Sequence, residues 1–182
     1  MALSKIQAES MNLADTFAFS GTVSGAGGGK VLQVKQTINN TPSTLSTSLG
    51  DVMSVQITPS ASSSKILVLV NFMVAHQNSH SGVAVLYRGS TPLGGGAGDY
   101  PGSASQDNNM FLIRTLEIHN IDSNNMTYYD ENANSASQLT YTLKAKSTGT
   151  TNGLYINRAV NTGNYEYNSS VMSTITAMEI GA

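Results

Sequence analysis

Short segments in which apolar and polar residues alternate recur along most of the chain. Residues 31–38 and 52–58 alternate in this way, and residues 139–145 place Leu, Tyr and Ala on one face and Thr and Lys on the other. A period of two residues is typical of a strand that buries one face of an antiparallel sheet. Residues 65–75 are apolar at most positions, which predicts a strand that is covered on both faces.

The same reasoning predicts further strands, separated by clusters of Asn, Pro, Ser and Gly that favour turns. These strands are expected at residues 82–88, 110–119, 126–129, 138–146, 153–157 and 171–180. No window beyond the N-terminal segment shows a convincing apolar stripe with the period of a helix. Eight or nine short strands with loops of variable length predict an all-β protein, an antiparallel β-sandwich with a jelly-roll-like topology.

The N-terminal segment differs from the rest of the chain. Bulky apolar residues lie there among small polar ones without a sustained period, and a glycine-rich stretch follows at 25–30. We therefore expect an extended arm and joint over residues 1–30 and a β-sandwich domain over residues 31–182. The residues expected to dock this arm on a partner are Ile6, Met11, Leu13, Phe17 and Phe19. The alternative is that the arm covers an open end of its own domain.

Charged residues make up only 11% of the chain, against about 25% in ordinary soluble domains. Ser, Thr, Asn and Gly take their place, which suits a β-protein that packs against other subunits or works outside the cell. The net charge of -2 and the absence of a basic block argue against nucleic-acid binding. The longest apolar run, at 65–75, is too short for a membrane helix, and the N-terminus lacks the features of a signal peptide.

Two glycine-rich stretches resemble nucleotide-binding loops only in their glycine content. At 25–30, Ser24 stands where the phosphate-binding motif requires a glycine, and Val31 follows Lys30 where the motif requires Ser or Thr. At 94–99 no helical pattern follows, so a loop is the better interpretation. No nucleophile elbow is present in a strand–turn–helix context either. The sequence therefore predicts neither an enzyme nor a cofactor.

The histidines offer one candidate metal site. His76 and His80 are four residues apart within a polar segment, and Asp99 or Asp107 could complete a zinc site with them. A solvated turn is the favoured interpretation, because no second ligand pair stands at a fixed spacing. His119 is expected to close a subunit contact. We therefore predict no bound metal.

Three acidic residues expected in loops are candidates for a calcium site or for a catalytic pair of carboxylates. Asp122, Asp130 and Glu131 lack the spacing of a calcium-binding loop. A pair of carboxylates for glycoside hydrolysis would require a cleft that sequence alone does not show. A hydrolase is therefore the least favoured function for this chain.

The tyrosines fall into two groups. Those inside predicted strands are expected to fill the core or an interface: Tyr87, Tyr141 and Tyr155. Those in polar loops offer an apolar ring and a hydroxyl group for contact with protein or sugar: Tyr100, Tyr165 and Tyr167. The alternative for the second group is an ordinary surface role.

Four segments together resemble virion structural proteins of tailed bacteriophages, particularly marine and cyanobacterial phages. They are LSKIQAESMNLADTFAFSGTVSG at 3–25, VAVLYRGSTPLGGG at 83–96, LTYTLKAKSTGTTNGLYINR at 139–158 and STITAMEIGA at 173–182. The resemblance covers both ends and the middle of the chain, although none of its motifs is chemically diagnostic.

This resemblance implies a trimeric jelly-roll module on the particle surface, assembled in the host cytoplasm. The chain has no long fibre shaft, which favours a capsid decoration (cement) protein docked on other virion proteins. The alternative is the receptor- or glycan-binding tip of a short tail or head fibre, with host glycans as partners of the loop tyrosines.

Overall fold

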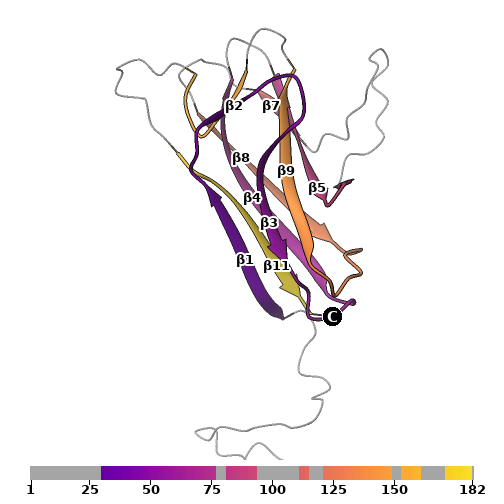
Figure 1. Ribbon diagram of the computed structural model, residues 1–182. Helices are drawn as coiled ribbons and strands as arrows, with labels where there is room; N and C mark the ends of the chain where they lie inside the picture. The colour runs from indigo at the N-terminus through magenta and orange to yellow at the C-terminus, as the bar shows by residue number, and fades with distance from the viewer. Residues whose placement is uncertain are drawn as a thin grey trace, which may run out of the picture.

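The computed structural model describes residues 30–76, 81–93, 111–114, 121–148, 153–160 and 171–181, and these form strands and their connections (Figure 1). The strands are β1 (Val31–Asn39), β2 (Ser43–Leu45), β3 (Gly50–Ile57), β4 (Lys65–His76), β5 (Ser81–Arg88), β6 (Thr91–Leu93), β7 (Phe111–Arg114), β8 (Asp122–Asp130), β9 (Leu139–Ser147), β10 (Leu154–Ile156) and β11 (Ser173–Ile180). All pairings between them are antiparallel.

The strands form two sheets that face one another. In the first, sheet A, the long strands stand in the order β1-β11-β4-β8, and β10 and β2 extend it beyond the end of β11. In the second, sheet B, the order is β3-β9-β5, and β7 and β6 pair with successive parts of the far side of β5. These two orders are those of a jelly roll, in which most successive strands alternate between sheets. The predicted antiparallel β-sandwich is confirmed.

The core lies between the two sheets and follows from the alternation seen in the sequence. Along β4 every second side chain from Ile66 to Val74 points inward and is buried, and along β9 Tyr141 and Leu143 do the same. Phe72 has no exposed surface and lies in the same apolar cluster. Burial of one such side chain stabilises the fold by roughly 1.5 to 3 kcal/mol.

Polar contacts close the sandwich along both long sides. On one side, the side chains of β1 reach sheet B, where Asn39 Nδ2 donates to the carbonyl of Val52 at 2.8 Å. On the other side, Arg88 of β5 binds Asp130 of β8. Because these contacts join the sheets at their edges, the two layers curl toward each other.

Two predictions about the strands need correction, and a third is only partly tested. Asp122 and Asp130 were expected in loops, but they are the first and last residues of β8, which is longer than the predicted strand at 126–129. The strand expected at 110–119 is confirmed at Phe111–Arg114, and residues 110 and 115–120 lie outside the described chain. β4 is covered completely on its inner face only, since its outward side chains from Lys65 to Met73 are half-buried.

Candidate interaction surface

The outer face of sheet A carries apolar side chains where a free antiparallel sheet is usually polar. One residue from each long strand lies in register across it: Val34, Met178, Leu67 and Tyr129. We call these four residues the apolar row. Leu67 and Met178 at its centre are half-buried, whereas Val34 and Tyr129 at its ends are 52% and 45% exposed. The row therefore runs from one free edge of the sheet to the other.

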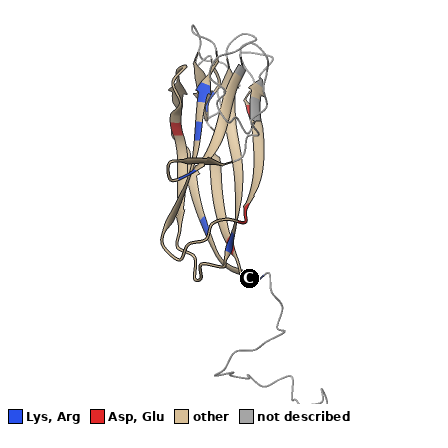
Figure 2. Ribbon diagram, turned by 90° about the vertical axis from the view of Figure 1, so that its right-hand side faces the viewer, with Lys and Arg blue, Asp and Glu red and all other residues tan. Residues whose placement is uncertain are grey.

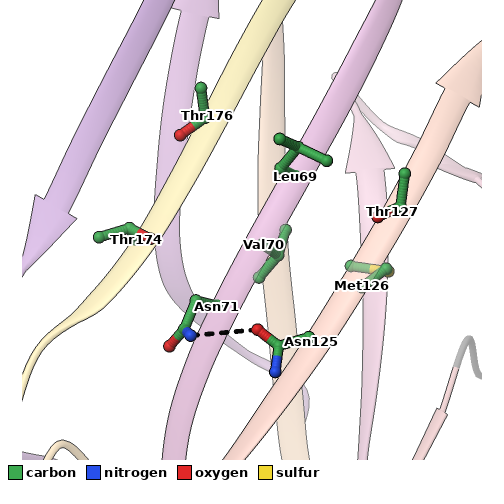
Figure 3. Close-up of a pocket in the computed structure, with 8 residues that line it drawn as sticks. All are labelled: Leu69, Val70, Asn71, Asn125, Met126, Thr127, Thr174 and Thr176. Atoms are coloured by element: carbon green, nitrogen blue, oxygen red, sulfur yellow. Dashed lines mark hydrogen bonds between the residues drawn. The ribbon is translucent and has the colours of Figure 1, made fainter.

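On one side of the apolar row, the next two rows of this face are mainly amide and hydroxyl groups. They comprise Gln36, Thr176, Leu69 and Thr127, followed by Ile38, Thr174, Asn71 and Asn125. Asn71 Nδ2 donates to Asn125 Oδ1 at 3.1 Å, and Gln36 Nε2 donates to Thr176 Oγ1 at 2.9 Å. The short side chains leave a shallow depression of about 330 Å³ around Leu69 (Figure 3). No charged residue belongs to these three rows.

Sheet B presents a different outer face. Lys144 and Lys146 project from β9, and Lys144 Nζ forms an ion pair with Asp51 of β3 at 2.8 Å. The same ammonium group lies 5.2 Å from the centre of the Tyr87 ring. Charges are sparse on the described strands as a whole (Figure 2). The two outer faces therefore differ in kind: sheet A has three successive rows without a charged residue, with Lys65 beyond them, whereas sheet B carries paired charges.

The edge strand β1 is unusually apolar on its exposed side. Of the six large apolar side chains that are exposed in the described part of the chain, four belong to it: Val31, Leu32, Val34 and Ile38. β1 pairs only with β11, so one edge of its backbone has no strand partner among the described residues. A long apolar edge strand is a ready site for pairing with another chain.

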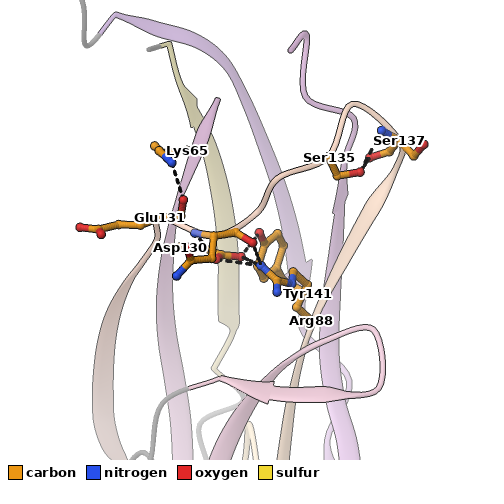
Figure 4. Close-up of polar contacts among 8 residues, drawn as sticks. Lys65, Arg88, Asp130, Glu131, Ser135, Ser137 and Tyr141 are labelled. Carbon is orange, nitrogen blue, oxygen red and sulfur yellow. Dashed lines mark hydrogen bonds and ion pairs between the residues drawn. The ribbon is translucent and has the colours of Figure 1, made fainter. Parts of the chain in front are cut away.

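A buried polar cluster ties sheet A to sheet B near the end of β8 (Figure 4). Arg88 Nη1 lies 2.8 and 2.7 Å from the two carboxylate oxygens of Asp130, and Tyr141 Oη donates to Asp130 Oδ2 at 2.7 Å. Burial and the adjacent Asp130 carboxylate raise the pKa of Tyr141 well above its usual value. The tyrosine therefore stays protonated, and the cluster acts as a structural clamp between β5, β8 and β9.

A second buried carboxylate, Glu179 of β11, is held by neutral donors. Ser60 N and Ser64 Oγ donate to its Oε1, each at 2.7 Å, and Gln33 Nε2 donates to its Oε2 at 2.6 Å. Burial alone would raise the pKa of Glu179, but the hydrogen bonds outweigh it and lower the pKa to about 2. The carboxylate therefore pins the loop after β3 and the edge strand β1 onto β11.

The predicted solvated turn at His76 is wrong. His76 is the last residue of β4 and is buried, with Nε2 at 2.9 Å from Ser147 Oγ. It was misassigned because its neighbours at 77–80 are polar, while β4 carries it into the core. His80, Asp99, Asp107 and His119 lie outside the described residues. Among the described residues, no group of three or more His, Asp and Glu side chains is placed to hold a metal ion.

The residues predicted to make external contacts also lie outside the described chain. They are the arm residues Ile6, Met11, Leu13, Phe17 and Phe19 and the loop tyrosines Tyr100, Tyr165 and Tyr167. Of the tyrosines predicted to fill the core or an interface, Tyr141 is buried, while Tyr87 and Tyr155 are half-buried. The ring of Tyr155 lies 4.7 Å from the guanidinium group of Arg158.

Sequence reasoning did not show which strands share the partly apolar outer face of sheet A. One signal for it was present, because residues 65–75 are apolar on both faces although one sandwich core covers only one of them. None of the described segments forms a helix that is long and apolar enough to cross a membrane.

The chain was also compared with known proteins. No protein-family model matches it, and no curated protein does so either. The resemblance to phage virion proteins therefore stays a prediction from the sequence.

Proposed function

We propose that this protein is a non-enzymatic structural subunit of a bacteriophage particle, a homotrimeric decoration protein on the capsid surface. The observation that supports this most is the outer face of sheet A, which is uncharged in three successive rows and apolar in one. Removing these three rows from water desolvates no charge, and their amide and hydroxyl groups can hydrogen-bond to a partner. Such a face is suited to contact with another protein.

The proposed mechanism is mechanical stabilisation rather than chemistry. A trimer would bury apolar surface between its copies at roughly 25 cal/mol per Å² of apolar area removed from water. When the N-terminal arms dock on capsid subunits, each trimer bridges joints between capsomers. Outward pressure from packaged DNA must then break these added contacts as well as those of the capsid itself.

The sequence resemblance contributes the phage context, and the low charged fraction of 11% agrees with an assembly role. The expected docking residues remain Ile6, Met11, Leu13, Phe17 and Phe19. The virion is then the expected location of the protein.

A cryo-EM map of the particle carrying the tagged protein tests this function. We expect density for it at symmetric positions over the whole capsid, and particles that lack it should release their DNA at a lower temperature. Density confined to one vertex or to the tail would contradict the decoration role.

The depression around Leu69 favours one alternative, a glycan-binding tip of a short fibre. Asn71, Asn125 and Thr127 offer hydrogen-bonding groups beside an apolar base, which is a chemistry suited to sugars. A glycan array separates the two roles. Specific sugar binding that is lost in Asn125→Ala would support the fibre tip, and no binding would support decoration.

A further inference from the structure

We propose that copies of this chain join edge to edge, with β1 of one copy adding to β8 of the next so that their A sheets become continuous. This inference rests on the proposed homotrimer and names the contact that builds it. β1 and β8 are the two long strands of sheet A that each have a single long partner, β11 and β4 respectively. Both contain nine residues, so they match in length.

The directions of the strands permit this pairing. Each neighbouring pair in the order β1-β11-β4-β8 is antiparallel, so β1 and β8 run in opposite directions. When copies are related by a rotation axis along the strands, β1 of one copy meets β8 of the next in antiparallel orientation. Such a contact uses two different surfaces and closes into a ring when the rotation allows it.

The charges at the two edges are complementary. Residues 30–39 contain Lys30 and Lys35 and no acidic residue, while residues 121–131 contain Asp122 and Glu131 and no basic residue, their third carboxylate, Asp130, being buried and paired with Arg88. The ion pairs within the described chain are Arg88–Asp130 and Lys144–Asp51, so Lys30, Lys35 and Glu131 have no ionic partner there. Antiparallel pairing brings the start of β1 to the end of β8, and therefore Lys30 toward Glu131.

The same charges disfavour pairing between identical edges. Lys35 is the central residue of β1, so a two-fold β1–β1 contact would place it opposite Lys35 of the other copy. Like charges directly opposite one another destabilise a strand pair. Lysine on an edge strand is a common device against indiscriminate pairing. Here it directs β1 toward the acidic edge.

Edge pairing also accounts for the exposed ends of the apolar row. Val34 is 52% exposed at the β1 edge, and Tyr129 is 45% exposed at the β8 edge. Joining the edges places Tyr129 of one copy beside the residues 31–34 of the next. The apolar row then continues across the boundary, and both exposed ends are buried.

Disulfide cross-linking tests the contact, since the chain contains no cysteine. Gln36 and Asn125 are both exposed on the outer face of sheet A, one at each edge. When the two nine-residue strands overlap fully, Gln36 lies opposite Asn125, and a shift of two residues, which keeps this face continuous, puts it opposite Ser123 or Thr127. Paired positions of this kind have the Cα separation of about 4.4–6.8 Å that a disulfide needs.

Two single-cysteine proteins, Gln36→Cys and Asn125→Cys, are mixed under mild oxidation and run on a non-reducing gel. We expect the mixture to form a covalent dimer, whereas each protein alone should stay a single chain. If the register differs by two residues, Ser123→Cys or Thr127→Cys should replace Asn125→Cys as the variant that cross-links to Gln36→Cys. Gln56→Cys, an exposed glutamine on the edge strand β3 of sheet B, is the matched control and should not cross-link to Asn125→Cys.

The outcomes separate the edge contact from the trimer. A double variant with both cysteines should give covalent species that end at three chains. Dimers of Gln36→Cys alone would show β1–β1 pairing and overturn the proposal. If no mixture cross-links while the native protein still has the mass of three chains, the edge contact is wrong and the trimer stands. If the native protein is monomeric as well, both fail.

Discussion

Single buried carboxylates hold this sandwich together at its seams. Asp130 neutralises Arg88 and accepts a hydrogen bond from Tyr141. Glu179 accepts hydrogen bonds from a serine in the loop after β3 and from a glutamine on β1. These contacts join residues more than a hundred positions apart in the case of Glu179. Local sequence patterns give no sign of such partners, which is why the sequence analysis did not find either cluster.

Glu179 makes the stability of the fold depend on acidity. Folding lowers its pKa from 4.5 to about 2, so the ionised form stabilises the fold above pH 4.5 and this contribution is lost as the pH falls toward 2. The wild-type free energy of unfolding should therefore fall by roughly 2 kcal/mol more than that of Glu179→Gln between about pH 6 and about pH 3. Urea denaturation at the two pH values measures this. An equal fall in the free energy of unfolding for wild type and Glu179→Gln would contradict the account.

The contribution of the Tyr141 hydroxyl group to stability can also be measured separately. Tyr141→Phe keeps the buried ring and removes only the hydrogen bond to the Asp130 carboxylate. Because that bond is to a charged group, the free energy of unfolding should drop by roughly 1.5 to 3 kcal/mol. Tyr129→Phe, at an exposed ring, is the control and should change it by less than about 0.5 kcal/mol. An equal effect of both substitutions would show that the clamp contributes nothing specific.

At the scale of the strand, the alternation of residues predicted most strands but not their orientation. In β1 the period of two is clear, yet the structure turns Val34 and Ile38 outward and Gln33 and Asn39 toward the seam with sheet B. A period shows which residues share a face, whereas the choice of inner face depends on distant partners such as Glu179.

The apolar row should matter for association and little for folding. The double variant Val34→Ser, Tyr129→Ser changes two exposed side chains. Each change should therefore alter the free energy of unfolding of the single chain by less than about 0.5 kcal/mol. Both side chains become buried between copies in the proposed trimer, so its dissociation constant should rise by at least about tenfold. A dilution series followed by light scattering measures this.

Gln56→Ser, on the outer face of sheet B, is the control for the apolar-row variant and should leave association unchanged. If the double variant associates as tightly as the wild type, the exposed ends of the apolar row are not part of the interface.

At the scale of the whole molecule, the chain divides into a strand-rich head and the predicted N-terminal arm. β1 begins at Val31, directly after the glycine-rich stretch. Deletion of residues 1–24 should therefore leave a folded head with nearly the same melting temperature that no longer joins particles. Circular dichroism and particle co-sedimentation measure the two effects. Loss of folding would show that the arm belongs to the domain.

The mass of the purified protein in solution tests the central claim, self-assembly through sheet A, most directly. Light scattering at micromolar concentration should give about three times the 19.1 kDa of one chain, and the Val34→Ser, Tyr129→Ser variant should move toward 19.1 kDa on dilution while remaining folded. A wild-type protein that stays at 19.1 kDa under these conditions would contradict the account.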